Sequence, residues 1–390
     1  MVINGVDAVC EHPDTIGYPA IGLFTNVTGT TRSLRRGVDA LLEAGLPVRA
    51  LFGPEHGLRG SVQAGQTESE TVDEATGLPV HETYEVSSER FADLIAASGV
   101  DALLFDMQDV GVRYYTYIWS MFDGMRAAAQ AGIPFVVLDR PNPLGGRRAQ
   151  GPGIAAGHES FLGRTDVPLR HGLTAGELAG LFRSRLAAEG TDVSLEVVRM
   201  SGWQGRADFP ATGLPWVPLS PNMPTLTAAY AYAATGLLEG TNISEGRGTT
   251  KPFELFGAPF FDARLLPALR DARLPGVLFR EAWYTPAFGK YAGQTLRGIQ
   301  LHIVDTDAFD PLLTILEMFS AISLLYGDRF AVLEAADDAP FRPIDRLWGD
   351  ATLGDAITNG RVDVEDFYQP ATDTGAGPYS DFLLYQGGES

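Results

Sequence analysis

Cysteine and lysine are nearly absent from this chain of 390 residues, which has one cysteine, Cys10, and two lysines, Lys251 and Lys290. A single cysteine can form neither an internal disulfide nor a cysteine-based zinc site. No apolar run approaches the roughly 20 residues of a membrane span. The N-terminal segment MVINGVDAVCEHPDTIGYPA has no basic region followed by an apolar one, so we expect no signal peptide. These absences predict a soluble, cytoplasmic protein.

Several cofactor and nucleophile motifs are also missing. The first predicted strand ends in TNVTGTTRSL, which lacks the G-x-G-x-x-G of dinucleotide-binding proteins. The segment GRGTTKP does not have P-loop spacing, and no G-x-S-x-G nucleophile elbow occurs. Of the six histidines, only His56 directly follows a predicted strand. We therefore expect no cofactor and no histidine-rich metal centre.

The charge of the chain is strongly one-sided, with 29 basic and 49 acidic residues and a formal net charge of -20. Nucleic acids and anionic membrane surfaces would repel a protein of this charge. We therefore expect no nucleic-acid partner and no membrane partner, and a small molecule as the ligand. The oligomeric state does not follow from the sequence.

Predicted strands and helices alternate along the first two thirds of the chain. The predicted strands are apolar on both faces, which is typical of a parallel sheet covered by helices on both sides. They span residues 20–29, 48–53, 100–109, 134–143 and 194–200. The predicted helices span residues 33–45, 88–98, a long segment ending near 131, 174–189 with a Thr174–Glu177 capping box, and 228–240. The pattern predicts an α/β fold with a Rossmann-like parallel sheet flanked by helices.

The pattern changes after about residue 260. Strands are predicted within 276–305, and an apolar helix within 311–327. We interpret residues 1–260 as a Rossmann-like domain and 261–390 as a smaller, mixed α+β domain. The Gly- and Arg-rich stretch 144–173 is expected to be an excursion over the site.

Polar side chains follow three successive predicted strands. In a parallel sheet, ligands bind beyond the carboxyl ends of the strands, so these side chains predict a site at that edge. A single loop of this kind could be a turn held by its own contacts, but three together favour a site. The residues concerned are Glu55 and His56, then Asp106, Gln108, Asp109, Arg113 and Tyr115, then Arg140 and Asn142.

Three further loops carry candidate binding residues. Each loop also has a structural interpretation. The loop 237–257 could be a connection held by its own ion pairs, 286–294 could be an exposed hairpin turn, and SPNMPT could be a rigid loop. The residues are Glu239, Asn242, Glu245, Arg247, Thr249 and Lys251 in the loop 237–257, Lys290 and Tyr291 in 286–294, and Asn222 in SPNMPT.

Carboxylates, aromatic rings, amides and arginines dominate these candidate loops. This set suits a carbohydrate-processing site, where two carboxyl groups perform acid–base chemistry and polar side chains bind hydroxyls. Two alternatives stay open from the residues alone. One is a metal-dependent hydrolase using Glu55, His56, Asp106 and Asp109. The other is a sugar-binding protein without catalytic activity.

Six long motifs occur in order along the chain: FTNVTG, LFGPEHGLRG, FDMQDVGVRYYTY, DRPNPLGG, SPNMPT and EGTNISEGRGTTKPFELFGAP. Together they resemble the exo-β-N-acetylmuramidases of the NamZ type, from about residue 18 to the C-terminus. The resemblance implies a Rossmann-like domain without a nucleotide and a smaller domain that closes a cleft. It also implies exo-acting hydrolysis that releases N-acetylmuramic acid from the non-reducing end of peptidoglycan fragments.

The resemblance implies roles for the candidate residues. Glu55 would be a catalytic carboxylate that His56 tunes or orients, and Glu245, or else Glu239, would fill the second role. The 2-acetamido group of the sugar could instead attack the anomeric carbon itself. A cation should bind the lactyl carboxylate of the muramyl sugar, and we expect Arg247 first, then Arg140 or Arg113. The remaining expected binding residues are His56, Asp106, Gln108, Asp109, Tyr115, Asn142, Asn222, Asn242, Thr249, Lys251, Lys290 and Tyr291.

Overall fold

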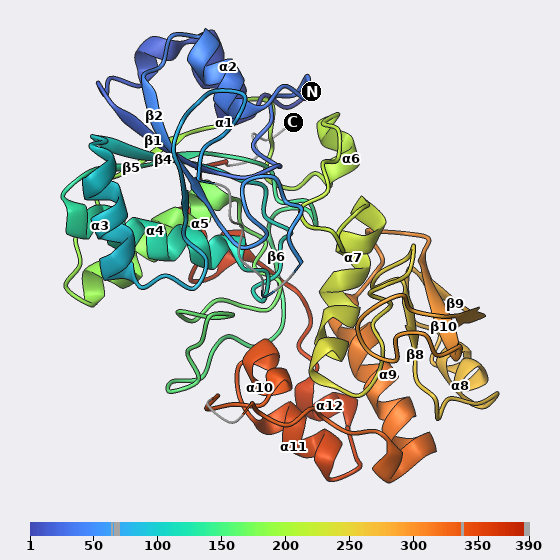
Figure 1. Cartoon of the computed structure of the whole chain (residues 1–390). Coiled ribbons are helices and arrows are strands. Elements are labelled where there is room, and N and C mark those ends of the chain that lie inside the picture. The colour runs from blue at the N-terminus through green and yellow to red at the C-terminus, as the bar shows by residue number, and fades with distance from the viewer. Residues whose placement is uncertain (64, 66–70, 337–338, 386–390) are drawn as a thin grey trace.

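A six-stranded parallel sheet organises the N-terminal part of the computed structural model, which describes residues 1–63, 65, 71–336 and 339–385 (Figure 1). The strand order is β3-β2-β1-β4-β5-β7, the order of a Rossmann-like sheet, as predicted. The strands are β1 (Ile21–Thr25), β2 (Val48–Gly53), β3 (Val80–Glu82), β4 (Ala102–Asp106), β5 (Phe135–Leu138) and β7 (Leu195–Val198).

Helices cover both faces of this sheet. Successive strand residues point to opposite faces, so Leu23 packs in an aliphatic layer with α1 and α2. Its neighbour Phe24 packs in an aromatic layer with α3 and α4, edge-to-face on Phe91 at 5.3 Å. The helices are α1 (Gly5–Glu11) and α2 (Gly37–Glu43) on the first face, with α3 (Ser88–Ser98), α4 (Tyr117–Ala131) and α5 (Ala175–Ala188) on the second.

The predicted elements exist, but most are shorter than expected. The helix predicted from residue 33 begins at Gly37, because Leu34 lies in a turn with φ of 63° and is 55% exposed. The side chain of Ser87, one residue before the predicted start at 88, caps α3. The Thr174–Glu177 capping box is present, as predicted. The three-residue strand β3 was not expected, because it is too short to show a period.

The C-terminal part contains a three-stranded antiparallel sheet in the order β8-β10-β9. The apolar helix α9 (Pro311–Tyr326) packs on α7 (Leu226–Thr235) and α8 (Leu265–Asp271). Within the described residues, 311–329 alone have the length and composition of a membrane span. The domain boundary near residue 260 stays a prediction. The other elements are β8 (Leu255–Gly257), β9 (Val277–Tyr284), β10 (Leu296–Ile303), α6 (Phe209–Thr212), α10 (Pro343–Trp348), α11 (Thr352–Thr358) and α12 (Val364–Phe367).

The stretch 144–173 is mostly irregular and runs between the two parts. Its short strand β6 (Arg148–Ala149) pairs with β11 (Thr372–Asp373) near the other end of the chain. Arg113 fixes it further, because its guanidinium donates hydrogen bonds to the carbonyls of Pro152 and Val167 at 2.6 and 3.0 Å.

The last described residues are attached to the N-terminal part by a buried carboxyl group. Glu177 accepts hydrogen bonds from the backbone N–H groups of Thr174 and Leu384, at 2.9 and 3.0 Å. Burial raises the pKa of Glu177 to about 7, with Asp139 adding to the rise and the two hydrogen bonds opposing it. The folded chain therefore holds this proton to a higher pH than the unfolded chain.

We expect the stabilisation from this proton to be fully present below the ordinary glutamate pKa and lost as the pH rises through about 7. At 1.36 kcal/mol per pKa unit, the loss is about 3 kcal/mol. Urea unfolding at pH 5 and pH 8 would measure it in the natural chain and in Glu177→Gln. The free energy of unfolding should change less between pH 5 and pH 8 in the variant than in the natural chain. An equal change in both proteins would contradict this assignment.

Candidate active site

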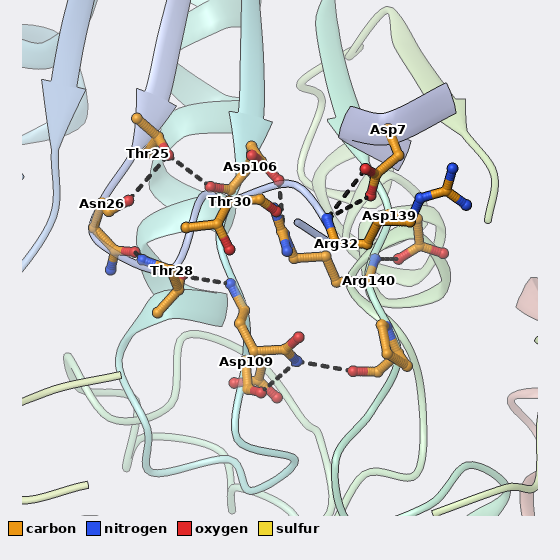
Figure 2. Close-up of polar contacts among 12 residues, drawn as sticks. Asp7, Thr25, Asn26, Thr28, Thr30, Arg32, Asp106, Asp109, Asp139 and Arg140 are labelled. Atoms are coloured by element: carbon orange, nitrogen blue, oxygen red, sulfur yellow. Dashed lines mark hydrogen bonds and ion pairs between the residues drawn. The ribbon is translucent and has the colours of Figure 1, made fainter. Parts of the chain in front are cut away.

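The strand-end residues Asp106 and Arg140 form a buried ion pair, with 2.7 Å between Arg140 Nε and Asp106 Oδ1 (Figure 2). Arg140 also donates to the carbonyl of Thr30 at 2.8 Å. Burial raises the pKa of Asp106, and the guanidinium of Arg140 opposes that rise. This network joins the loops after β1, β4 and β5. These side chains therefore bind one another at the edge of the sheet where a Rossmann-like fold binds its nucleotide.

Gln108, Asp109 and Asn142 also make contacts within the protein. Gln108 donates to the carbonyls of Asp109 and Pro141, at 2.9 and 2.8 Å. The Asp109 carboxylate lies 2.9 Å from Nε2 of His171. Asn142 donates to the carbonyl of Leu173 at 3.0 Å. These side chains join three loops to one another and are not among the residues around the cavity described next.

A cavity of about 240 Å³ opens beside β2, between the N-terminal part, the excursion and the C-terminal part. Six predicted site residues meet there: Glu55, His56, Tyr115, Asn222, Glu239 and Arg247. The other lining residues are Tyr84, Glu85, Tyr114, Thr116, Phe161, Leu162, Ser220, Met223, Tyr232, Phe253, Arg346 and Leu347.

Glu55 is 7% exposed and its carboxylate is held from several directions. Oε1 accepts a hydrogen bond from the backbone N–H of Gly65 at 3.1 Å, and Oε2 accepts one from Oγ1 of Thr116 at 2.8 Å. Burial raises the pKa of Tyr84, and the charge of Glu55 and a hydrogen bond with it raise that pKa further. The turn after β2 and Thr116, the residue just before α4, therefore fix this carboxylate at the cavity wall.

His56 sits beside Glu55 with a positive φ of 72°. Its Nδ1 lies 2.7 Å from the carbonyl oxygen of Val62, which can only accept, so Nδ1 carries the proton of the neutral ring. Burial lowers the pKa of His56, although the charge on Glu55 acts in the opposite direction. The ring is therefore neutral near pH 7, with its lone pair on Nε2.

Tyrosine rings build one wall of the cavity. Tyr115 packs edge-to-face on Tyr117 at 4.9 Å and on Tyr232 at 5.9 Å. Tyr114 packs on Tyr232 at 5.1 Å and donates from its hydroxyl to the Tyr232 carbonyl at 2.8 Å. The loop after β4 therefore supplies two of the rings that form this wall, and Tyr232 of α7 packs against both of them.

A chain of alternating charges extends from the cavity into the loop 237–257. Arg247 pairs with Glu239 at 2.7 Å and with Glu245 at 3.4 Å, and Lys290 pairs with Glu245 at 3.0 Å. The Arg247 guanidinium also lies over the ring of Phe253, at 5.2 Å. The charges of Glu239 and Glu245 outweigh burial and raise the pKa of Arg247. Glu239 thus faces the cavity, whereas Glu245 lies behind it between two cations.

Four other predicted residues of these loops bind within the protein. Asn242 donates to the carbonyl of Arg329 at 2.8 Å, and Thr249 donates to that of Gly246 at 2.6 Å. The remaining contacts are Lys251 to Glu254 at 3.0 Å and the Tyr291 hydroxyl to the Asn242 carbonyl at 2.6 Å. Lys290 also donates to three backbone carbonyls. These contacts match the structural alternative of a loop held by its own polar groups.

Arg113 is fully buried and lies outside the cavity lining. Besides the two carbonyls of the excursion, it donates to those of Leu347 and Trp348 at 2.8 and 2.6 Å. Burial lowers the pKa of Arg113 to about 10. Arg113 therefore ties the excursion to α10, beside the cavity.

Sequence reasoning missed several lining residues. Tyr84 follows β3, so it too lies beyond a strand end, but that strand was not predicted. Phe161 packs on Tyr84 at 5.5 Å from within the irregular excursion. Arg346 belongs to the six-residue helix α10. No motif or period marks either of the last two positions.

The residues proposed for a metal site do not come together. Asp106 pairs with Arg140 and Asp109 with His171, whereas Glu55 and His56 line the cavity. Within the part of the chain that the structure describes, no three His, Cys, Asp or Glu side chains form a group able to hold a metal ion. This arrangement does not favour the metal-dependent alternative.

Comparison with known families resolves the kind of protein. The N-terminal family model of exo-β-N-acetylmuramidase NamZ matches residues 21–227, and the C-terminal model matches residues 230–374. The chain belongs to the NamZ family. This confirms the resemblance drawn from the motifs.

NamZ relatives agree in sequence and in fold. The peptidoglycan β-N-acetylmuramidase NamZ of Bacillus subtilis (strain 168) is 46% identical over 362 residues, which are 92% of this chain and 85% of that protein. A crystal structure of a DUF1343 family protein from Bacteroides fragilis matches with a TM-score of 0.84 and 32% identity, over 99% of both chains. A second such protein from that organism matches with a TM-score of 0.72 and 27% identity over the full length of both.

Proposed function

We propose that this protein is an exo-acting glycoside hydrolase that releases N-acetylmuramic acid from the non-reducing end of peptidoglycan fragments. Membership of the NamZ family supports the reaction class. The observation that carries the proposal is that the carboxyl groups of Glu55 and Glu239 line one cavity. Hydrolysis of a glycosidic bond requires such a pair, or one carboxyl group and a substrate acetamido group.

The surroundings of the two carboxyl groups suggest different roles. Glu55 lies in a buried turn among hydroxyl and N–H donors, where it can exchange a proton with the glycosidic oxygen. Glu239 pairs with Arg247 at 2.7 Å, and its carboxylate can stabilise the positive charge that develops at the anomeric carbon. The same position would let Glu239 orient a 2-acetamido group that attacks that carbon. Both pathways fit these contacts.

The size of the cavity supports exo action. About 240 Å³ lies below the roughly 300–1,000 Å³ typical of pockets for drug-sized ligands. Phe161 and Leu162 of the excursion and Leu347 of α10 border this space. A site of this size suits one terminal sugar better than the interior of a long glycan.

The test is incubation with a muramyl-glucosaminyl disaccharide. We expect N-acetylmuramic acid and N-acetylglucosamine to appear in equal amounts, and activity to persist after exhaustive chelation. Cross-linked cell walls should lose little turbidity under the same conditions. Rapid clearing of walls before free N-acetylmuramic acid appears would contradict exo action. Binding of the disaccharide without turnover would favour the sugar-binding alternative.

A further inference from the structure

The cavity is lined by two guanidinium groups that differ in their partners. Arg247 is already neutralised, because Glu239 and Glu245 both pair with it. The Arg346 side chain makes no hydrogen bond and no ion pair within residues 1–63, 65, 71–336 and 339–385, and its Nε is buried without a hydrogen-bond partner. Because Arg346 lines the cavity and no carboxylate among the described residues pairs with it, its guanidinium can offer N–H donors to an anionic ligand there.

Helix α10, which carries Arg346, is held firmly against the loop 237–257. Arg113 binds the carbonyls of Leu347 and Trp348, the next two residues of α10. On the other side, α10 touches the turn that carries Glu239, where a Cβ on Gly240 would lie only 2.6 Å from the backbone nitrogen of Ile344. These contacts fix the backbone of Arg346, and its side chain lines the same cavity as Glu239.

We propose that Arg346 binds the carboxylate of the lactyl ether that distinguishes N-acetylmuramic acid from N-acetylglucosamine. This inference rests on the proposed function and names a residue that would determine its specificity. A protein with net charge -20 repels an anionic sugar at long range, so recognition needs a local cation. A guanidinium can hold a carboxylate through two parallel hydrogen bonds.

The other candidate cations are occupied elsewhere. Arg140 pairs with buried Asp106, Arg113 binds four carbonyls, and Lys290 binds Glu245 and three carbonyls. Lys251 pairs with Glu254. Because Arg247 balances two glutamates, a third carboxylate beside it would leave negative charge unpaired. The Arg346 side chain has no ion pair among the described residues.

The test compares two substrates, the muramyl-glucosaminyl disaccharide and the same molecule with its lactyl carboxyl group converted to a methyl amide. Hydrogen bonds to charged groups contribute enough for a preference of roughly 10- to 150-fold. We expect Arg346→Met to lower kcat/KM on the free acid by about that factor, mainly through KM, and to change it little on the amide. Arg346→Lys should restore part of the loss on the acid only. Arg361→Gln, at an exposed ion pair with Asp363, is the matched control and should change neither substrate.

Equal losses of kcat/KM on both substrates would overturn the proposal, and Arg247 would then be the next candidate to bind the lactyl carboxylate. Inhibition of the unmodified enzyme provides a second measurement that does not depend on a variant folding. Free N-acetylmuramic acid should inhibit roughly 10-fold or more better than its methyl amide, and equal inhibition would also overturn the proposal. An unmodified enzyme that hydrolyses neither disaccharide would instead reject the proposed function.

Discussion

Glu55→Gln is expected to lower kcat by about 10²–10⁴-fold, the range of general acid–base contributions. Glutamine keeps the shape of the side chain: its Oε1 can still accept from the Gly65 N–H, and its Nε2 can donate to the Thr116 hydroxyl, so the turn after β2 should survive. What it loses is the proton that a glutamic acid can give to the glycosidic oxygen. Initial rates on the muramyl-glucosaminyl disaccharide would measure the effect, and KM should change much less than kcat.

Glu196→Gln provides a matched control for this variant. Glu196 lies on β7, accepts a hydrogen bond from the Tyr18 hydroxyl and is not among the residues that line the cavity, so its replacement should leave kcat unchanged. An unchanged melting temperature of Glu55→Gln would exclude unfolding as the cause of the loss. Activity of Glu55→Gln within a few-fold of the unmodified enzyme would refute the role of Glu55.

Sequence patterns were sufficient to predict the parallel sheet and the part of the site that contains Glu55 and His56. Buried parallel strands are apolar over their whole length, so the edge where Glu55 and His56 emerge could be located without a structure. The same rule placed Asp106 and Arg140 at that edge. It could not show that these two charges pair with each other at 2.7 Å. A strand end delivers polar groups, but only the packing decides whether they meet a ligand or one another.

The opposite side of the cavity could not be predicted, because it forms only when distant segments pack together. Arg346 reaches the cavity from a helix that lies almost 300 residues after Glu55. A six-residue helix has fewer than two turns and shows no reliable hydrophobic period. Its position depends on Arg113 and on the close contact at Gly240. Both are tertiary contacts that no local pattern records.

The loop 237–257 shows why carboxylates with similar sequence surroundings can have different roles. Glu239 and Glu245 both lie in the Gly-rich loop 237–257, and Glu245 was the first expectation for the second catalytic role. The structure puts only Glu239 at the cavity. Glu245 is 5% exposed and accepts from Lys290 while it pairs with Arg247. The geometry therefore favours Glu239 for chemistry and Glu245 for support.

Glu239→Gln and Glu245→Gln are therefore expected to fail in different ways. Glu239→Gln should lower kcat by about 10²-fold or more, since a neutral amide cannot stabilise the charge at the anomeric carbon. Its melting temperature should fall little, because the Arg247–Glu239 pair is partly exposed. Glu245→Gln leaves Lys290 and Arg247 without their shared anion, and breaking a buried pair costs about 3–5 kcal/mol.

Melting curves and initial rates on the same preparations separate the two effects. Glu245→Gln should melt at a clearly lower temperature and, at temperatures well below that transition, retain more kcat than Glu239→Gln. Glu189→Gln, at a half-exposed pair with Arg126 on the protein surface, is the control for loss of one glutamate charge. The opposite outcome, with Glu245→Gln stable but inactive and Glu239→Gln active, would assign the second catalytic role to Glu245.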